Sequence, residues 1–181
     1  MGGIKKHPPC LALIAVFSRY DRALDWLNDQ VVKQFGPIAI QSQRFEFSES
    51  AYYQPTMGNG LKKQFLVLER FYDPSNLASD KHLANQLELD FAASYPTEES
   101  RPLNVDPGYF SLTKLVLAST KNREHRVYLR DGVFAEVTLA YRDQKWQTMQ
   151  WTYPDYQRED FRLFFETARQ HLLRQMRSVE K

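Results

Sequence analysis

Apolar residues recur along this chain in short unbroken runs and in helical spacing, and the two patterns alternate. An apolar run over residues 11–17 predicts a buried strand. Asp21 can then cap a helix with one apolar face, and Gly36-Pro37 ends that helix. Alternation late in residues 38–47 predicts a half-buried strand, and residues 64–71 predict another strand. The first part of the chain therefore indicates strand, helix, strand, strand.

The second part begins with another helix and ends with one. Asp73-Pro74-Ser75 opens a predicted helix that runs to about Ala93. Near the end of the chain, residues 159–177 carry one apolar stripe at helical spacing and give the clearest helix. The strands predicted between these helices are residues 126–129, 133–141 and 145–151, and the first two flank Arg130-Asp131-Gly132, a three-residue hairpin signal. Residues 48–60 and 95–102 are expected to be loops.

Residues 101–120 are harder to interpret. Asn104-Val105-Asp106-Pro107-Gly108 contains Pro and Gly and predicts a turn. Residues 111–120 fit a helix capped by Ser111, but their central apolar residues also fit a strand. The spacing slightly favours the helix.

This order of elements predicts an α+β fold. We expect a mixed, largely antiparallel sheet with three to four helices packed mainly on one face. A ferredoxin-like core with extra hairpin strands is compatible with that order. Residues 10–178 are expected to form a single domain, preceded by a flexible extension over residues 1–9.

Composition narrows the function classes. The 181 residues suit one domain, and 43% of them are hydrophobic, which is enough for a core. A net charge of +2 argues against a non-specific nucleic-acid binder. Cys10 is the only cysteine, so no intramolecular disulfide can form and a cytoplasmic location is expected. The longest apolar run is far short of the roughly 20 residues that a membrane helix needs.

Several unusual short strings occur along the chain, namely Tyr52-Tyr53, Met57-Gly58, Leu61-Lys62, Asn104 to Tyr109, Lys114 to Ala118, His125 to Leu129, Phe134 to Leu139 and Trp151 to Tyr156. With these strings the chain resembles an uncharacterised bacterial and archaeal family, domain of unknown function 4416. The resemblance spans roughly Leu11 to Leu172. It implies a single-domain protein of about this length, and it brings no established activity.

Ionisable residues are threaded through the strand-like sequence after residue 100. A lone buried charge is very costly, so these side chains must either reach solvent or meet one another. His125 and Glu136 are the candidate catalytic pair, because histidine can transfer protons near neutral pH and a carboxylate can orient it. The alternative is a structural ion pair between Arg126 and Glu136 on a sheet face.

A small anionic ligand, such as a nucleotide or a phosphorylated metabolite, is the predicted partner. Lys114, Lys121 and Arg126 can together bind a phosphate, and a helix beginning at Ser111 would add free backbone N–H groups. The remaining predicted ligand-binding residues, which would complete the cleft, are Asp106, Tyr109, Tyr153 and Asp155.

Other features are weaker. Lys81, Asn85 and Glu88 share one helix face, which is ordinarily solvated but could widen the site beside Glu69 and Arg70. The histidines are not spaced as metal ligands usually are, so no metal site is predicted. A magnesium ion bound by carboxylates such as Asp106, Glu136 or Asp155 stays an alternative. No pattern identifies a cofactor or an oligomeric state.

The alternative function is a non-enzymatic module that binds RNA or another protein. Tyr52 and Tyr53 can stack on a planar group, and Gly58–Lys63 forms a basic, glycine-containing loop beside them. That loop lacks the spacing of a phosphate-binding P-loop. In this alternative the charged hairpin only stabilises the fold.

Overall fold

A single antiparallel sheet forms the centre of the protein. The structure is a computed structural model that describes residues 3–179. Within them the sheet has nine strands in the order β2-β4-β1-β5-β6-β8-β7, with β3 beside β4 and β9 beside β8. The strands are β1 (Leu11–Ser18), β2 (Ile38–Gln41), β3 (Phe45–Phe47), β4 (Leu61–Phe71), β5 (Asn104–Phe110), β6 (Lys114–Ser119), β7 (Val127–Arg130), β8 (Val133–Arg142) and β9 (Lys145–Thr148).

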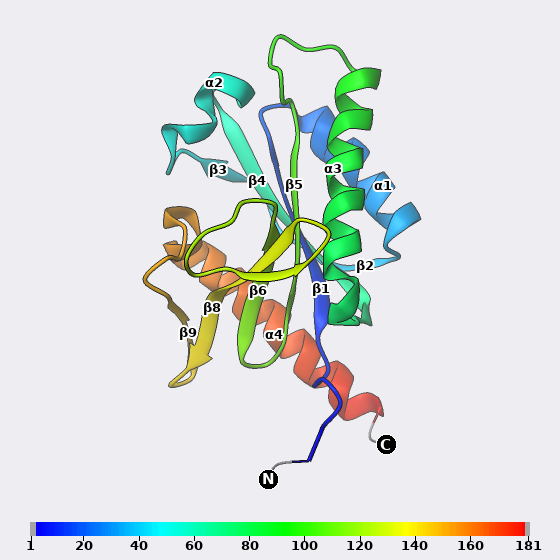
Figure 1. Cartoon of the computed structure of the whole chain (residues 1–181), viewed down its shortest axis with the longest axis vertical. Helices are drawn as coiled ribbons and strands as arrows, with labels where there is room; N and C mark the ends of the chain where they lie inside the picture. Colours follow the sequence, from blue (N-terminus) through cyan, green and yellow to red (C-terminus); the bar gives the residue numbers. More distant parts are fainter. Residues whose placement is uncertain (1–2, 180–181) are drawn as a thin grey trace.

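Helices cover both faces of this sheet (Figure 1). The helices are α1 (Asp21–Gln34), α2 (Gln54–Met57), α3 (Leu77–Ser94) and α4 (Glu159–Val179), with short 3₁₀ turns η1 (Ala51–Tyr53), η2 (Pro74–Asn76) and η3 (Pro154–Gln157). Ile14 and its alternate neighbours on β1 pack on α1 and α3, whereas Leu13 and its alternate neighbours pack on α4. This alternation is the ordinary consequence of successive side chains pointing to opposite faces of a strand.

The predicted α+β class is confirmed, and two details need correction. Every strand pair is antiparallel, so the sheet is not mixed. The helices do not pack mainly on one face, because α4 covers the face opposite α1 and α3. The ferredoxin-like core is not shown.

Residues 104–120 form two strands where a turn and a helix are predicted. Gly108 is not a turn glycine: a Cβ there would lie 2.3 Å from the Val116 carbonyl oxygen, so glycine permits β5 and β6 to approach. The helix prediction for residues 111–120 is wrong, because the run Leu115–Ala118 is buried between β5 and β8 as strand β6. Ser111 therefore begins no helix and offers no helix N-terminus.

Smaller predictions also differ from the structure. The strand predicted over residues 38–47 is two strands, and the loop over 48–60 contains η1 and α2. α1 begins at Asp21 itself, with Tyr20 in the cap position. The hairpin has a two-residue loop, since Asp131 and Gly132 both have positive φ, as a type I′ turn requires.

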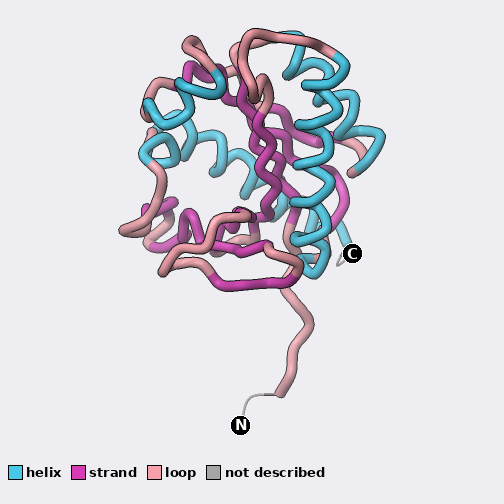
Figure 2. Tube along the Cα trace, turned by 45° about the horizontal axis from the view of Figure 1, so that its top comes forward, coloured by secondary structure: helices cyan, strands magenta, loops and turns pink. Residues whose placement is uncertain are grey.

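The sheet bends strongly at its outer strands. In Figure 2 the strands at the bottom of the view run across the direction of the central ones. Register shifts occur where β8 pairs with β6 and with β7, and such bulges bend a strand. The tip of the β7–β8 hairpin contacts the start of α3, where Arg130 donates a 2.7 Å hydrogen bond to Ser79 Oγ. The bend brings β8 toward α3.

The predicted N-terminal extension, residues 1–9, lies partly outside the described residues. Gly3–Pro9 contains neither helix nor strand and precedes β1. No helix of the described chain is long and apolar enough to cross a membrane.

Candidate functional site

A cavity of about 330 Å³ opens where β5 and β6 separate. The β5–β6 ladder covers only Gly108–Phe110 of β5, because Pro107 has no N–H to continue it. Beyond that point the two strands splay. Asp106 of β5 and Ser119 of β6 line the cavity that results.

Seven of the nine predicted site residues line this cavity. They are Asp106, Lys121, His125, Arg126, Glu136, Tyr153 and Asp155. The structure thus brings them together. Tyr109 and Lys114 do not line it: Tyr109 packs in a separate cluster with Cys10, and Lys114 begins β6 opposite Ala140.

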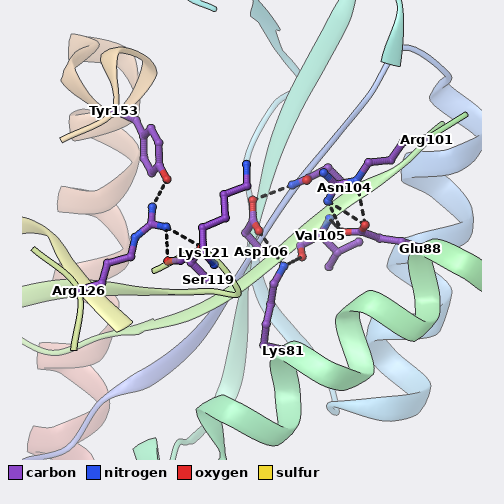
Figure 3. A network of polar contacts seen from close by, with 10 residues as sticks. All are labelled: Lys81, Glu88, Arg101, Asn104, Val105, Asp106, Ser119, Lys121, Arg126 and Tyr153. Atoms are coloured by element: carbon purple, nitrogen blue, oxygen red, sulfur yellow. Dashed lines mark hydrogen bonds and ion pairs between the residues drawn. The ribbon is translucent and has the colours of Figure 1, made fainter. Parts of the chain in front are cut away.

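Arg126 and Glu136 form the centre of one wall. Arg126 Nε donates to Glu136 Oε2 at 2.7 Å, and both side chains are at most 3% exposed. Arg126 Nη1 donates to Ser119 Oγ and to the Lys121 carbonyl oxygen, each at 2.8 Å, and Nη2 donates to the Tyr153 hydroxyl oxygen (Figure 3). Burial alone would lower the pKa of Arg126, but Glu136 holds it above its ordinary value. Arg126 therefore ties β6, β8 and Tyr153 together.

His125 completes the same wall. Its Nε2 lies 2.9 Å from Glu136 Oε2, and its ring stacks on Trp151 with the ring planes 9° apart. Trp151 is itself fixed, because its indole N–H donates a 2.9 Å hydrogen bond to the Val137 carbonyl oxygen of β8. If Nε2–H donates to the carboxylate, Nδ1 is left as a proton acceptor. The candidate catalytic pair is therefore in direct contact.

α3 and β5 supply the opposite wall (Figure 3). Lys81 Nζ donates to Asp106 Oδ1 and to the Val105 carbonyl oxygen, both at 2.9 Å. Asn104 Nδ2 donates to Asp106 Oδ2 at 2.6 Å. Burial raises the pKa of Asp106, but Lys81 and the other donors outweigh it and leave the pKa below its ordinary value. Asp106 is thus held as a charged carboxylate.

Asn85 lies one helical turn beyond Lys81 and also lines the cavity. Glu88, the third residue of that helix face, pairs instead with Arg101 at 2.8 Å. The interpretation of this face as solvated is wrong for Lys81, which is 3% exposed. Its neighbours are Val105 and Asp106, whereas the sequence pointed to Glu69 and Arg70.

The floor contains a third buried ion pair. Lys63 Nζ lies 2.5 Å from Asp155 Oδ2, with both side chains about 5–6% exposed. The same ammonium sits 4.3 Å from the centre of the Tyr156 ring, a cation–π distance. Burial raises the pKa of the Tyr156 hydroxyl well above its ordinary value, so the group stays neutral.

Lys121 and Arg123 lie at the mouth. Lys121 Nζ donates a 2.7 Å hydrogen bond to the Tyr52 hydroxyl, which lowers the pKa of Tyr52. Neither cation has a carboxylate partner within residues 3–179. Tyr53 lines the cavity behind Tyr52, and burial raises its pKa.

The cavity wall carries more positive than negative charge. Among the described residues, six Lys and Arg side chains line it against four carboxylates. Three of the carboxylates are neutralised inside by Lys63, Lys81 and Arg126. The surplus therefore comes from the remaining cations, chiefly those at the mouth. No group of three or more metal-ligating side chains occurs within residues 3–179.

The sequence did not single out Asn104, Arg101 or Arg123 as site residues, and it assigned Lys63 only to the loop of the alternative function. Lys63 is the last residue of the predicted Gly58–Lys63 loop but lies in strand β4, and only its distant partner Asp155 shows that it faces inward. The helical spacing of Lys81 and Asn85 was the one available signal for the α3 wall.

These features define an α+β domain with a charged cavity at a splayed strand pair. A scan against protein-family models matches residues 8–172 to the family described as Domain of unknown function (DUF4416). The chain belongs to that family. Neither the search of curated proteins nor the search of solved structures gave a match.

Proposed function

We propose that the cavity binds a small anionic ligand, a nucleotide or another phosphorylated metabolite. The observation that carries this proposal is the pair of cations at the mouth, Lys121 and Arg123, neither of which has a carboxylate partner in the described chain. A phosphate placed between them would supply the missing countercharge. The cavity volume, about 330 Å³, lies in the range of roughly 300–1,000 Å³ typical of small-molecule sites.

Tyr52 and Tyr53 support a small ligand over an extended RNA surface. Both line the cavity, and Tyr53 packs edge to face on Phe17 at 4.7 Å between ring centres. Of the Gly58–Lys63 loop, only Lys63 lines the cavity, and it is paired with Asp155. Three residues of the RNA- or protein-binding alternative, Tyr52, Tyr53 and Lys63, thus line the same cavity.

Binding is tested by calorimetric titration with AMP, ribose 5-phosphate and inorganic phosphate. We expect wild-type protein to bind at least one phosphate ester. The Lys121→Ala/Arg123→Ala variant should bind it at least tenfold more weakly, because two charge-assisted contacts are lost. The control is Arg142→Ala/Lys145→Ala, which removes the same charge from the exposed β8–β9 turn. Equal affinities for the two double variants would overturn the proposal.

Proton transfer by His125 is the chemical part of the proposal. Glu136 accepts from Nε2 and Trp151 holds the ring plane, which leaves Nδ1 to take a proton from a ligand. The test is turnover of a bound phosphate ester, followed by phosphorus NMR. His125→Gln should abolish turnover while affinity changes less than threefold. Equal turnover by the variant, or no turnover by wild type, would remove the catalytic role and leave binding intact.

A further inference from the structure

The wall opposite His125 has hydrogen-bonding capacity that the protein does not use. The side-chain amide of Asn85 forms no hydrogen bond within residues 3–179, although it lines the cavity and is half-buried. An amide offers two donors and an acceptor with two lone pairs. Asn85 is thus available to a ligand, and its removal takes no hydrogen bond away from the described fold.

Asp106, on the same wall of the cavity as Asn85, is a fixed hydrogen-bond acceptor. Lys81 links Asp106 to the position of Asn85. It lies one helical turn from Asn85 on α3, and its ammonium contacts Asp106 Oδ1 at 2.9 Å. The Asp106 side chain keeps 29% of its surface exposed after accepting from Lys81 and Asn104. A carboxylate has about four acceptor positions, so those two bonds leave others free. Because Lys81 cancels its charge, this wall suits a neutral, hydrogen-bonding group better than a second phosphate.

Unpartnered polar atoms occur on the other sides of the cavity as well. Glu136 Oε1 and the Tyr156 hydroxyl are buried and have no hydrogen-bond partner within residues 3–179, and both residues line the cavity. Buried polar groups are normally hydrogen-bonded, so each such group calls for an explanation. Glu136 Oε1 can only accept when ionised, whereas the tyrosine hydroxyl can also donate. Hydroxyl groups, which donate and accept at once, fit the free amide of Asn85 and the free acceptor positions of Asp106.

We infer that the ligand is a phosphate monoester with vicinal hydroxyl groups, whose hydroxyls are recognised by Asn85 and Asp106 while its phosphate lies at Lys121 and Arg123. This inference rests on the proposed function and specifies the chemistry of the ligand's uncharged end, the end away from its phosphate. A sugar phosphate and the ribose of a nucleotide share this chemistry. Asn85 is then a specificity-determining residue.

The experiment compares ligands that differ by one hydroxyl group. Two pairs are titrated into the protein: ribose 5-phosphate with 2-deoxyribose 5-phosphate, and AMP with 2′-deoxy-AMP. Inorganic phosphate is titrated alone as a probe of the mouth. We expect the hydroxyl-bearing member to bind about tenfold more tightly, as the loss of one or two ligand hydrogen bonds predicts. A preference in the sugar pair alone would indicate a sugar phosphate, and a preference in the AMP pair would indicate a nucleotide.

Asn85→Ala provides the residue test. This variant should erase most of the hydroxyl preference, leave phosphate affinity unchanged and keep the melting temperature, because alanine favours helices and no internal hydrogen bond is lost. Gln86→Ala, at the next and exposed helix position, is the matched control. Its hydroxyl preference should equal that of wild type.

The outcomes separate this inference from the proposed function. Phosphate esters that bind through Lys121 and Arg123 with no hydroxyl preference would overturn the inference alone. A preference that survives in Asn85→Ala would overturn the role of Asn85. Absence of binding by every ester and by inorganic phosphate would overturn both.

Discussion

The charged side chains around the cavity divide into two regions that differ in pairing. In the interior, Lys63, Lys81 and Arg126 each contact a carboxylate and are at most 9% exposed. At the mouth, Lys121 and Arg123 are exposed and lack such a partner within residues 3–179. Breaking a buried pair leaves an uncompensated charge, whereas an exposed cation has little effect on stability. The interior pairs therefore shape the cavity, and the mouth cations are the ones that our proposal assigns to the ligand.

Two basic residues that look alike in the sequence, Arg126 and Lys121, fall on different sides of this contrast. Arg126 and Lys121 are both basic and close together in the chain, but nearly all donors of Arg126 are occupied by the protein. The structure thus contains the Arg126–Glu136 ion pair considered from the sequence and the His125–Glu136 contact at once. The same carboxylate oxygen, Glu136 Oε2, takes part in both contacts.

The largest expected effect is on Arg126. Arg126→Ala leaves Glu136 buried without its strongest partner, which should lower the free energy of unfolding by about 3–5 kcal/mol. Urea denaturation at pH 7 measures this loss. The control is Arg123→Ala, three positions earlier and exposed, which should unfold at nearly the wild-type urea concentration. Comparable losses in the two variants would erase the distinction between interior and mouth.

Asp106→Asn should have an intermediate effect, about 2 kcal/mol at pH 7, because it weakens a hydrogen bond to a buried ammonium group. The pKa of Asp106 lies below its ordinary value of 3.8 in the folded protein, since Lys81 and the other donors outweigh the effect of burial. A carboxylate with a depressed folded pKa stabilises the protein above its unfolded pKa, and this contribution is lost as the pH falls through the folded pKa.

The stability difference between wild type and Asp106→Asn should therefore be constant above about pH 5 and shrink as the pH falls below 3.8. Denaturation at a series of pH values measures it. Asp29→Asn, an exposed position on α1 with no ion pair in residues 3–179, should show no such dependence. A difference independent of pH would mean that Asp106 is not held charged by Lys81.

Much of the fold was predictable from local patterns. The run Leu11–Phe17 and the stripe of α4 specify their elements, because each pattern matches one periodicity and one buried face. Pro107 and Gly108 misled the prediction for the opposite reason. Their local signal is a turn, but the neighbouring β6 backbone decides the conformation, and that contact is non-local.

The site was predictable only in part, for a similar reason. The predicted residues after position 100 that converge on the cavity lie on β5, on β8, in the loop between β6 and β7, and at η3. A charged stretch of sequence pointed to them. Lys63 and Lys81 belong to other segments, and their partners lie 92 and 25 residues away. Burial of a lysine follows from its distant partner, which no local pattern reveals.

The smallest expected effect concerns Lys121 and tests the mouth directly. Its hydrogen bond lowers the pKa of the exposed Tyr52 hydroxyl, so Lys121→Ala should raise that pKa toward the ordinary tyrosine value. Lys121→Arg should keep it low, because a cation remains. The melting temperature should not change in either variant, since no buried charge loses a partner.

NMR titration of the tyrosine ring carbons measures this pKa, with Tyr52→Phe identifying the signal. Inorganic phosphate should raise the same pKa in wild type, because a bound anion disfavours the phenolate and competes for Lys121. The Lys121→Ala/Arg123→Ala variant should show no phosphate effect. A Tyr52 pKa that ignores phosphate in wild type would show that the mouth does not receive the anion, and the contrast with the paired interior would then lose its functional meaning.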